Sequence, residues 1–175
     1  MSRLTPAVGP EDHAQGALDS PQVLVEYGDF ECPYCGQAYP ELKAVQRAMG
    51  DTLCFVFRHF PLRKAHPHAE HAAEFSEAAA TVGEFWDMHD LLYENQFSLS
   101  DSDLTLYAQK LGLADDLIDF TRTGQFAPRV QRDFSSGVRS GVNGTPSLFL
   151  NGARYDGPVE ASALIRLLRS LRSIP

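Results

Sequence analysis

Two short apolar runs near the N-terminus have the pattern of buried strands. Residues 23–27 read VLVEY and residues 52–60 read TLCFVFRHF, and both are rich in β-branched or aromatic side chains. Between them, Tyr39, Leu42, Val45 and Met49 recur at spacings of three and four, which predicts a helix over about 32–49 that ends at Gly50. A strand, a helix and a strand in this order predict a β–α–β unit with parallel strands. Residues 1–21, which are rich in Pro, Gly and Asp, are predicted to be an extended lead-in.

Helical patterns then fill the middle of the chain, before the strand pattern returns. Helices are predicted at 67–83, 84–95, 100–112, 115–122 and 128–140. Strands follow at 147–150 and 153–157 around an Asn-Gly turn, which is typical of a hairpin, and an amphipathic helix at 160–173 closes the chain. The predicted fold is α/β: β-α-β, a helical insertion and β-β-α around a mixed four-stranded sheet. We expect one integrated domain. Its first half is residues 1–66, the helical insertion is residues 67–141, and its second half is residues 142–175.

Length and charge limit the partners that this chain can have. Its 175 residues are most simply one domain. The formal net charge of −8 disfavours nucleic acid and anionic membranes as partners. Because no apolar run has the length of a signal peptide or a membrane span, we expect a monomeric cytoplasmic protein, unless a leader has been removed.

The chemistry of the chain is concentrated in its cysteines. Cys32 and Cys35 form a Cys-Pro-Tyr-Cys motif where the first strand gives way to the first helix, whereas Cys54 is alone on the second strand. A zinc site needs four ligands, and no second cysteine pair is present to complete one. The histidines at 59, 66, 68 and 71 are close in sequence but lack a metal-binding spacing, so we expect no metal and no cofactor. Cys54 is expected to be a buried core thiol.

A redox role fits the cysteine pair better than a structural disulfide does. Three cysteines cannot all pair, and cytosolic thiols stay reduced unless they are catalytic. A cysteine at a helix N-terminus is stabilised as the thiolate, which is the form that attacks disulfides. Cys32 has this position, and Cys35, one turn further along, can resolve a mixed disulfide.

Five segments together resemble the DsbA-like thiol-disulfide oxidoreductase family. They are DHAQGALDSPQVLVEYGDFECPYCG, FVFRHFPLRKAHPHAEHAAEFSEAA, GEFWDMHDLL, LYAQKLGL and SGVNGTPSLFLNG, which are spread over nearly the whole chain. The resemblance is to the bacterial branch that is also found as the soluble C-terminal domain of sodium/proton antiporters. It implies a thioredoxin fold with a helical insertion.

The resemblance also implies roles for residues around the cysteines. Pro33 and Tyr34 are the dipeptide that tunes the redox potential. Glu26 matches a buried acid that helps to move the proton of the resolving cysteine. Thr145 and Pro146 match the cis-proline loop, in which the proline approaches the disulfide and the backbone of the preceding residue pairs with substrate.

The expected partners are protein thiols or disulfides, or glutathione. The main alternative is a redox-silent binding or regulatory module with the same fold. Glutaredoxins share the Cys-Pro-Tyr-Cys motif but are much shorter and lack a helical insertion of this size. The direction of electron flow and the physiological substrate do not follow from the sequence.

Overall fold

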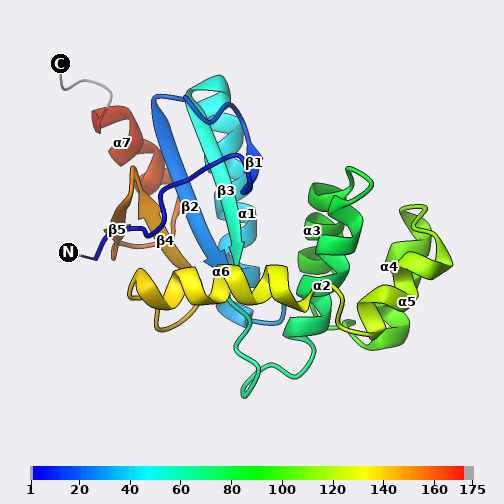
Figure 1. Cartoon of the computed structure of the whole chain (residues 1–175). Helices are drawn as coiled ribbons and strands as arrows, with labels where there is room; N and C mark the ends of the chain where they lie inside the picture. The colour runs from blue at the N-terminus through cyan, green and yellow to red at the C-terminus, as the bar shows by residue number, and fades with distance from the viewer. Residues whose placement is uncertain (1, 172–175) are drawn as a thin grey trace.

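The computed structural model describes residues 2–171 and confirms the thioredoxin-like α/β fold. Its sheet has five strands in the order β1-β3-β2-β4-β5, so the predicted count of four misses one (Figure 1). β2 and β3 are parallel, and the other neighbouring strands are antiparallel. The strands are β1 (His13–Gln15), β2 (Gln22–Gly28), β3 (Leu53–His59), β4 (Ser147–Leu150) and β5 (Ala153–Tyr155).

The additional strand, β1, lies in the segment that was predicted to be an extended lead-in. Its three residues are half-buried and pair antiparallel with residues 55–57 at the edge of the sheet. A segment this short, with two polar residues out of three, has no hydrophobic alternation, so the sequence pattern could not reveal it. Backbone pairing with β3 and polar contacts from neighbouring side chains hold it in place.

Helices cover both faces of the sheet, and the helices from 69 to 122 form a further group beside it (Figure 1). α1 packs against α7 on one face, and α6 contacts β3. A single 3₁₀ turn at Gly50–Thr52 connects α1 to β3. The predicted closing helix is present as α7, and the part of it beyond 171 lies outside the described residues. The helices are α1 (Pro33–Met49), α2 (Ala69–Ala80), α3 (Phe85–Glu94), α4 (Asp101–Lys110), α5 (Asp115–Arg122), α6 (Ala127–Arg139) and α7 (Ala161–Leu171).

The alternation of side chains along the strands separates two cores. Leu24 of β2 belongs to the larger core, with residues of α1, α7 and the inserted helices. Val25 and Tyr27 belong to the smaller core on the opposite face. Because successive side chains of a strand point to opposite faces, Glu26 points to the same face as Leu24, toward the helix that carries the cysteine pair.

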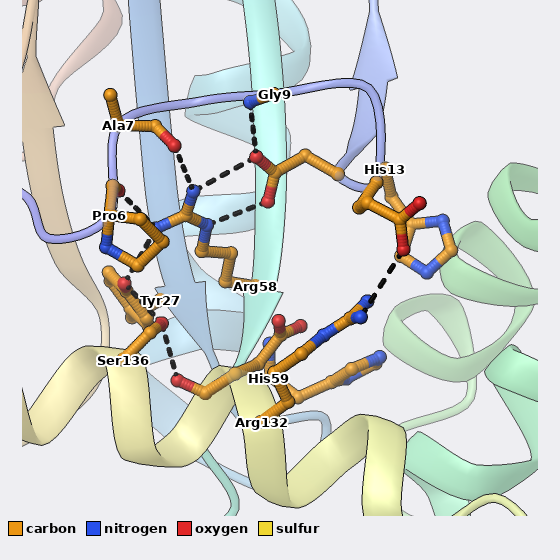
Figure 2. A network of polar contacts seen from close by, with 12 residues as sticks. Pro6, Ala7, Gly9, His13, Tyr27, Arg58, His59, Arg132 and Ser136 are labelled. Carbon is orange, nitrogen blue, oxygen red and sulfur yellow. Dashed lines mark hydrogen bonds and ion pairs between the residues drawn. The ribbon is translucent and has the colours of Figure 1, made fainter.

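Arg58 ties the N-terminal segment to the smaller core (Figure 2). Its guanidinium donates two hydrogen bonds to the Asp12 carboxylate, at 2.7 and 2.9 Å, and one to the Tyr27 hydroxyl at 3.0 Å. Further bonds reach the carbonyls of Pro6 and Ala7. A buried charge is stable only when it is paired and fully hydrogen-bonded, and this network meets both conditions.

The inserted helices contact the end of the sheet at which β2 and β3 finish. The Tyr27 hydroxyl and the Ser136 hydroxyl of α6 are 2.7 Å apart, and the ring of Tyr93 from α3 stacks on Tyr39 of α1 with centroids 5.3 Å apart. No helix within residues 2–171 is long and apolar enough to cross a membrane.

Candidate active site

The Cys-Pro-Tyr-Cys motif lies where β2 ends and α1 begins. Cys32 is the N-cap residue of α1, with an extended backbone (φ −72°, ψ 121°), and Pro33 occupies the first turn, where its missing N–H costs nothing. Tyr34 is 69% exposed, whereas Cys32 is 3% exposed and Cys35 is fully buried. The motif therefore presents its dipeptide to solvent and holds both thiols at the base of the turn.

The surroundings of Cys32 favour its thiolate. Its pKa is lowered from 9.0 to about 5. The hydrogen bond from Cys35 contributes most and outweighs the opposing effect of burial, while Thr145 and the backbone N–H groups of Cys35 and Tyr34 add to it. These N–H groups belong to the first turn of α1, where the helix leaves its donors unpaired.

The surroundings of Cys35 and Glu26 instead favour the protonated forms of both groups. Burial raises the pKa of Cys35 well above its ordinary value, with further contributions from Cys32 and Glu26. Glu26 is buried, as expected, and burial followed by the charge of Cys32 raises its pKa from 4.5 to about 8. Its Oε1 has no hydrogen-bond partner among the described residues. The site thus pairs a thiol that ionises easily with one that needs a proton acceptor.

The loop before β4 closes the site on the other side. The Thr145–Pro146 peptide bond is cis, and the Cys32 thiol donates to the carbonyl of Thr145 at 3.4 Å. Both loop residues are half-buried. The structure therefore brings together Glu26 and the two cysteines with a loop more than 100 residues away in the chain.

Gln96, which the sequence did not single out, also belongs to this site. It lies between α3 and α4, and its Nε2 donates to the carbonyls of Cys32 at 2.7 Å and Phe30 at 2.9 Å. Gly36 provides the space, because an added Cβ there would overlap the Gln96 carboxamide. The signal in the sequence is weak, since a single glutamine in a polar loop has no pattern.

The histidines that are close in sequence do not gather into one site. His66 donates to the buried Asp29 carboxylate at 2.7 Å, and His71 pairs with Asp101 on the surface. Burial alone would lower the pKa of His66, but the Asp29 carboxylate outweighs it and raises this pKa above its ordinary value. His59 instead lies with a histidine and a glutamate from other elements, His13 and Glu77, and these three are the side chains of the described chain best placed to hold a metal.

Two of the surface depressions that border the exposed dipeptide run in different directions. One contacts Pro33 and runs toward the inserted helices, and the other contacts Tyr34 and runs along the proline loop. The first is lined by Glu31, Pro33, His66, His68, Gln96, Phe97, Leu99, Ser100 and Asp103. The second is lined by Tyr34, Gln37, Ala38, Thr145, Pro146, Pro158, Val159 and Glu160. Both depressions therefore border the exposed dipeptide of the motif.

Cys54 is a buried core thiol, as predicted. It is fully buried in β3 and belongs to the smaller core, on the face of the sheet opposite Glu26. Burial raises its pKa, so it stays a thiol at neutral pH.

Comparison with known proteins identifies relatives of nearly the whole chain. The sequence model of a family described as thioredoxin matches residues 9–170. A Na(+)/H(+) antiporter NhaA 1 of Mycolicibacterium vanbaalenii is 42% identical over 175 residues, and NhaA 3 of Salinispora tropica is 43% identical over 164 residues. The alignments cover 98% and 92% of this chain but only 28% and 25% of those proteins. The chain thus spans about a quarter of the length of these relatives.

Solved structures share the fold across nearly the whole chain. A thioredoxin-like oxidoreductase from Silicibacter pomeroyi superposes with a TM-score of 0.82 at 23% identity, covering 95% of each chain. BdbD from Bacillus subtilis gives 0.80 at 20% identity, covering 92% of each chain. Wolbachia pipientis alpha-DsbA1 gives 0.80 at 19% identity, covering 94% of this chain and 92% of its own.

Proposed function

We propose that this chain, which belongs to the thioredoxin family, is a thiol-disulfide oxidoreductase that exchanges electrons with protein thiols or disulfides, or with glutathione. The observation that carries the proposal is the contrast between the two thiols of one helical turn. The pKa of Cys32 is about 5, whereas that of Cys35 lies well above its ordinary value. A nucleophile and a resolving thiol need this difference.

In the reducing direction, the Cys32 thiolate attacks one sulfur of a substrate disulfide. The substrate S–S bond breaks, its other sulfur leaves as a thiolate, and a mixed disulfide joins Cys32 to the substrate. Cys35 then loses its proton to the Glu26 carboxylate and attacks the Cys32 sulfur. The second substrate thiolate leaves, so that the substrate gains two electrons and the protein is left with a Cys32–Cys35 disulfide. The oxidising direction follows the same steps in reverse.

The surrounding residues position the substrate and the attacking thiol. The backbone of Thr145 faces the Cys32 sulfur, so an extended substrate segment that pairs with this loop brings its disulfide to Cys32. Pro33 and Tyr34 lie at the mouth of the site and set its potential, while Pro146 fixes the loop. The cytoplasmic location and the monomeric state expected from the sequence stay predictions.

Trapping of mixed disulfides tests the proposal. In a Cys35→Ser variant, Cys32 still attacks but no thiol resolves the intermediate, so covalent adducts with a disulfide-bonded peptide accumulate. Wild-type protein reduces insulin in the presence of a dithiol, and Cys32→Ser does not. Cys54→Ala is the matched control, because it removes a cysteine outside the site and retains activity. Absence of insulin reduction by wild-type protein, together with absence of trapped adducts, would favour the redox-silent module.

A further inference from the structure

His13, His59 and Glu77 converge from three separate parts of the fold. His13 belongs to β1, His59 is the last residue of β3, and Glu77 belongs to α2. The Nε2 atoms of both histidines lie 2.7 Å from the same carboxylate oxygen, Oε1 of Glu77. All three ligand atoms are within 4.8 Å of one another. Figure 2 shows His13 and His59 from the N-terminal segment and from β3, next to the Arg58 network.

Two imidazoles and one carboxylate are a donor set that zinc uses, with water as a fourth ligand. In a tetrahedral site with ligands about 2.0–2.1 Å from the ion, neighbouring ligand atoms lie about 3.3 Å apart. The 2.7 Å separations at Glu77 would therefore have to open by about 0.6 Å.

The protein holds the two rings in place largely by packing. The ring of His13 stacks on Phe85, with centroids 3.5 Å apart and planes 8° apart. His59 packs against the edges of Phe57 and Phe85, and its Nδ1 has no hydrogen-bond partner among the described residues. The side chain of His13 is 16% exposed, whereas that of His59 is 1% exposed. An ion can thus enter past His13 and meet ligands that are already oriented.

The local charges also suit a bound cation. Oε1 of Glu77 accepts a hydrogen bond from the Nε2 atom of each histidine. The other oxygen, Oε2, lies 3.8 Å from Nε of Arg129. That guanidinium also forms an ion pair with Asp133, which offsets its repulsion of a second cation. Oε1, which both imidazoles already face, is therefore the oxygen that a metal bound between the histidines would meet.

We propose that His13, His59 and Glu77 form a binding site for a divalent metal ion. The preferred ion is zinc, and the site is separate from the cysteine pair. A metal there would connect the N-terminal strand, the central sheet and the helical insertion through a single centre. Because both histidines must lose the Nε2 proton to bind the ion, occupancy would decrease at acidic pH.

Zinc titration of the full chain in a Cys32→Ser/Cys35→Ser background tests the site without the redox thiols. Calorimetry should show one zinc ion bound per chain. His13→Asn and Glu77→Gln should each weaken the affinity by at least about ten-fold. His71→Asn is the matched control, because it removes an exposed histidine that also pairs with a carboxylate, and its affinity should equal that of the background protein.

Cobalt as a spectroscopic probe identifies the ligands. Bound Co²⁺ should give the visible bands of a four- or five-coordinate nitrogen and oxygen site, without the near-ultraviolet charge-transfer band of a cobalt–thiolate bond. Absence of stoichiometric zinc binding would overturn the proposal. So would an affinity that is unchanged by His13→Asn, a variant that alters only a half-buried residue of a short edge strand and is expected to fold even where Glu77→Gln does not.

Discussion

Replacing Glu26 by Gln should change the dependence of stability on pH in a direction that the structure fixes. The pKa of this buried carboxyl is raised from 4.5 to about 8, first by burial and then by the charge of Cys32. A group with a raised pKa in the folded state contributes stability that is fully present below the pKa of the unfolded state. That stability is lost as the pH rises toward the folded value. Wild-type protein should therefore lose stability between about pH 4.5 and pH 8 for this reason.

The size of the effect follows from the separation of the two pKa values. Each pH unit between them costs about 1.4 kcal/mol, so the full interval amounts to about 5 kcal/mol. In a protein without the Cys32 thiol, the charge of Cys32 no longer raises the pKa of Glu26. Burial, which is the larger cause of the raised pKa, remains. The free energy of unfolding of Glu26→Gln minus that of the parent should thus grow by several kcal/mol from pH 5 to pH 9.

Urea unfolding in a Cys32→Ser/Cys35→Ser background measures this difference without interference from the titrating thiols. Glu160→Gln, at an exposed position, is the matched control and should show a constant difference over the same range. Glu26→Leu should be more stable than the parent at every pH above 5, because it removes a buried polar group. A difference between Glu26→Gln and its parent that does not change with pH would show that the carboxyl is solvated, and would refute the raised pKa of Glu26.

Three further predictions concern the thiol, the loop of the insertion and the N-terminal segment. Thiolate absorbance of the reduced protein should titrate with a midpoint of about pH 5, and Cys32→Ser should abolish this transition; a midpoint near 9 would refute the assignment of the nucleophile. Gln96→Ala removes two hydrogen bonds, to the carbonyls of Cys32 and Phe30. It should lower the free energy of unfolding by about 2 kcal/mol, and an unchanged free energy of unfolding would show that water replaces both bonds. Asp12→Ala leaves the guanidinium of Arg58 buried without its carboxylate and should cost about 3–5 kcal/mol in urea unfolding; a loss below about 1 kcal/mol would mean that solvent reaches the pair.

The parts of the fold that sequence reasoning predicted are those that repeat at a regular period. The apolar run at 23–27 and the amphipathic helix after it bury one side against a core, and this burial imposes the pattern that the sequence displays. Glu26 was singled out because the resemblance matches it to a buried acid, and it lies inside an otherwise apolar run. The redox role of the Cys-Pro-Tyr-Cys motif could also be predicted, because the motif lies between a predicted strand and the start of a predicted helix.

The contacts that sequence reasoning missed are polar and join residues far apart in the chain. His13 and Glu77 are 64 residues apart, and so are Cys32 and Gln96. Neither pair produces a repeating pattern in the sequence, because a hydrogen bond needs only one correctly placed group at each end. Yet a buried donor or acceptor without a partner costs about 1–3 kcal/mol, so these contacts decide how the insertion sits against the sheet. The insertion therefore does more than cover an apolar face: Gln96 donates to the carbonyl of Cys32, and Glu77 contacts two histidines of the first half of the fold.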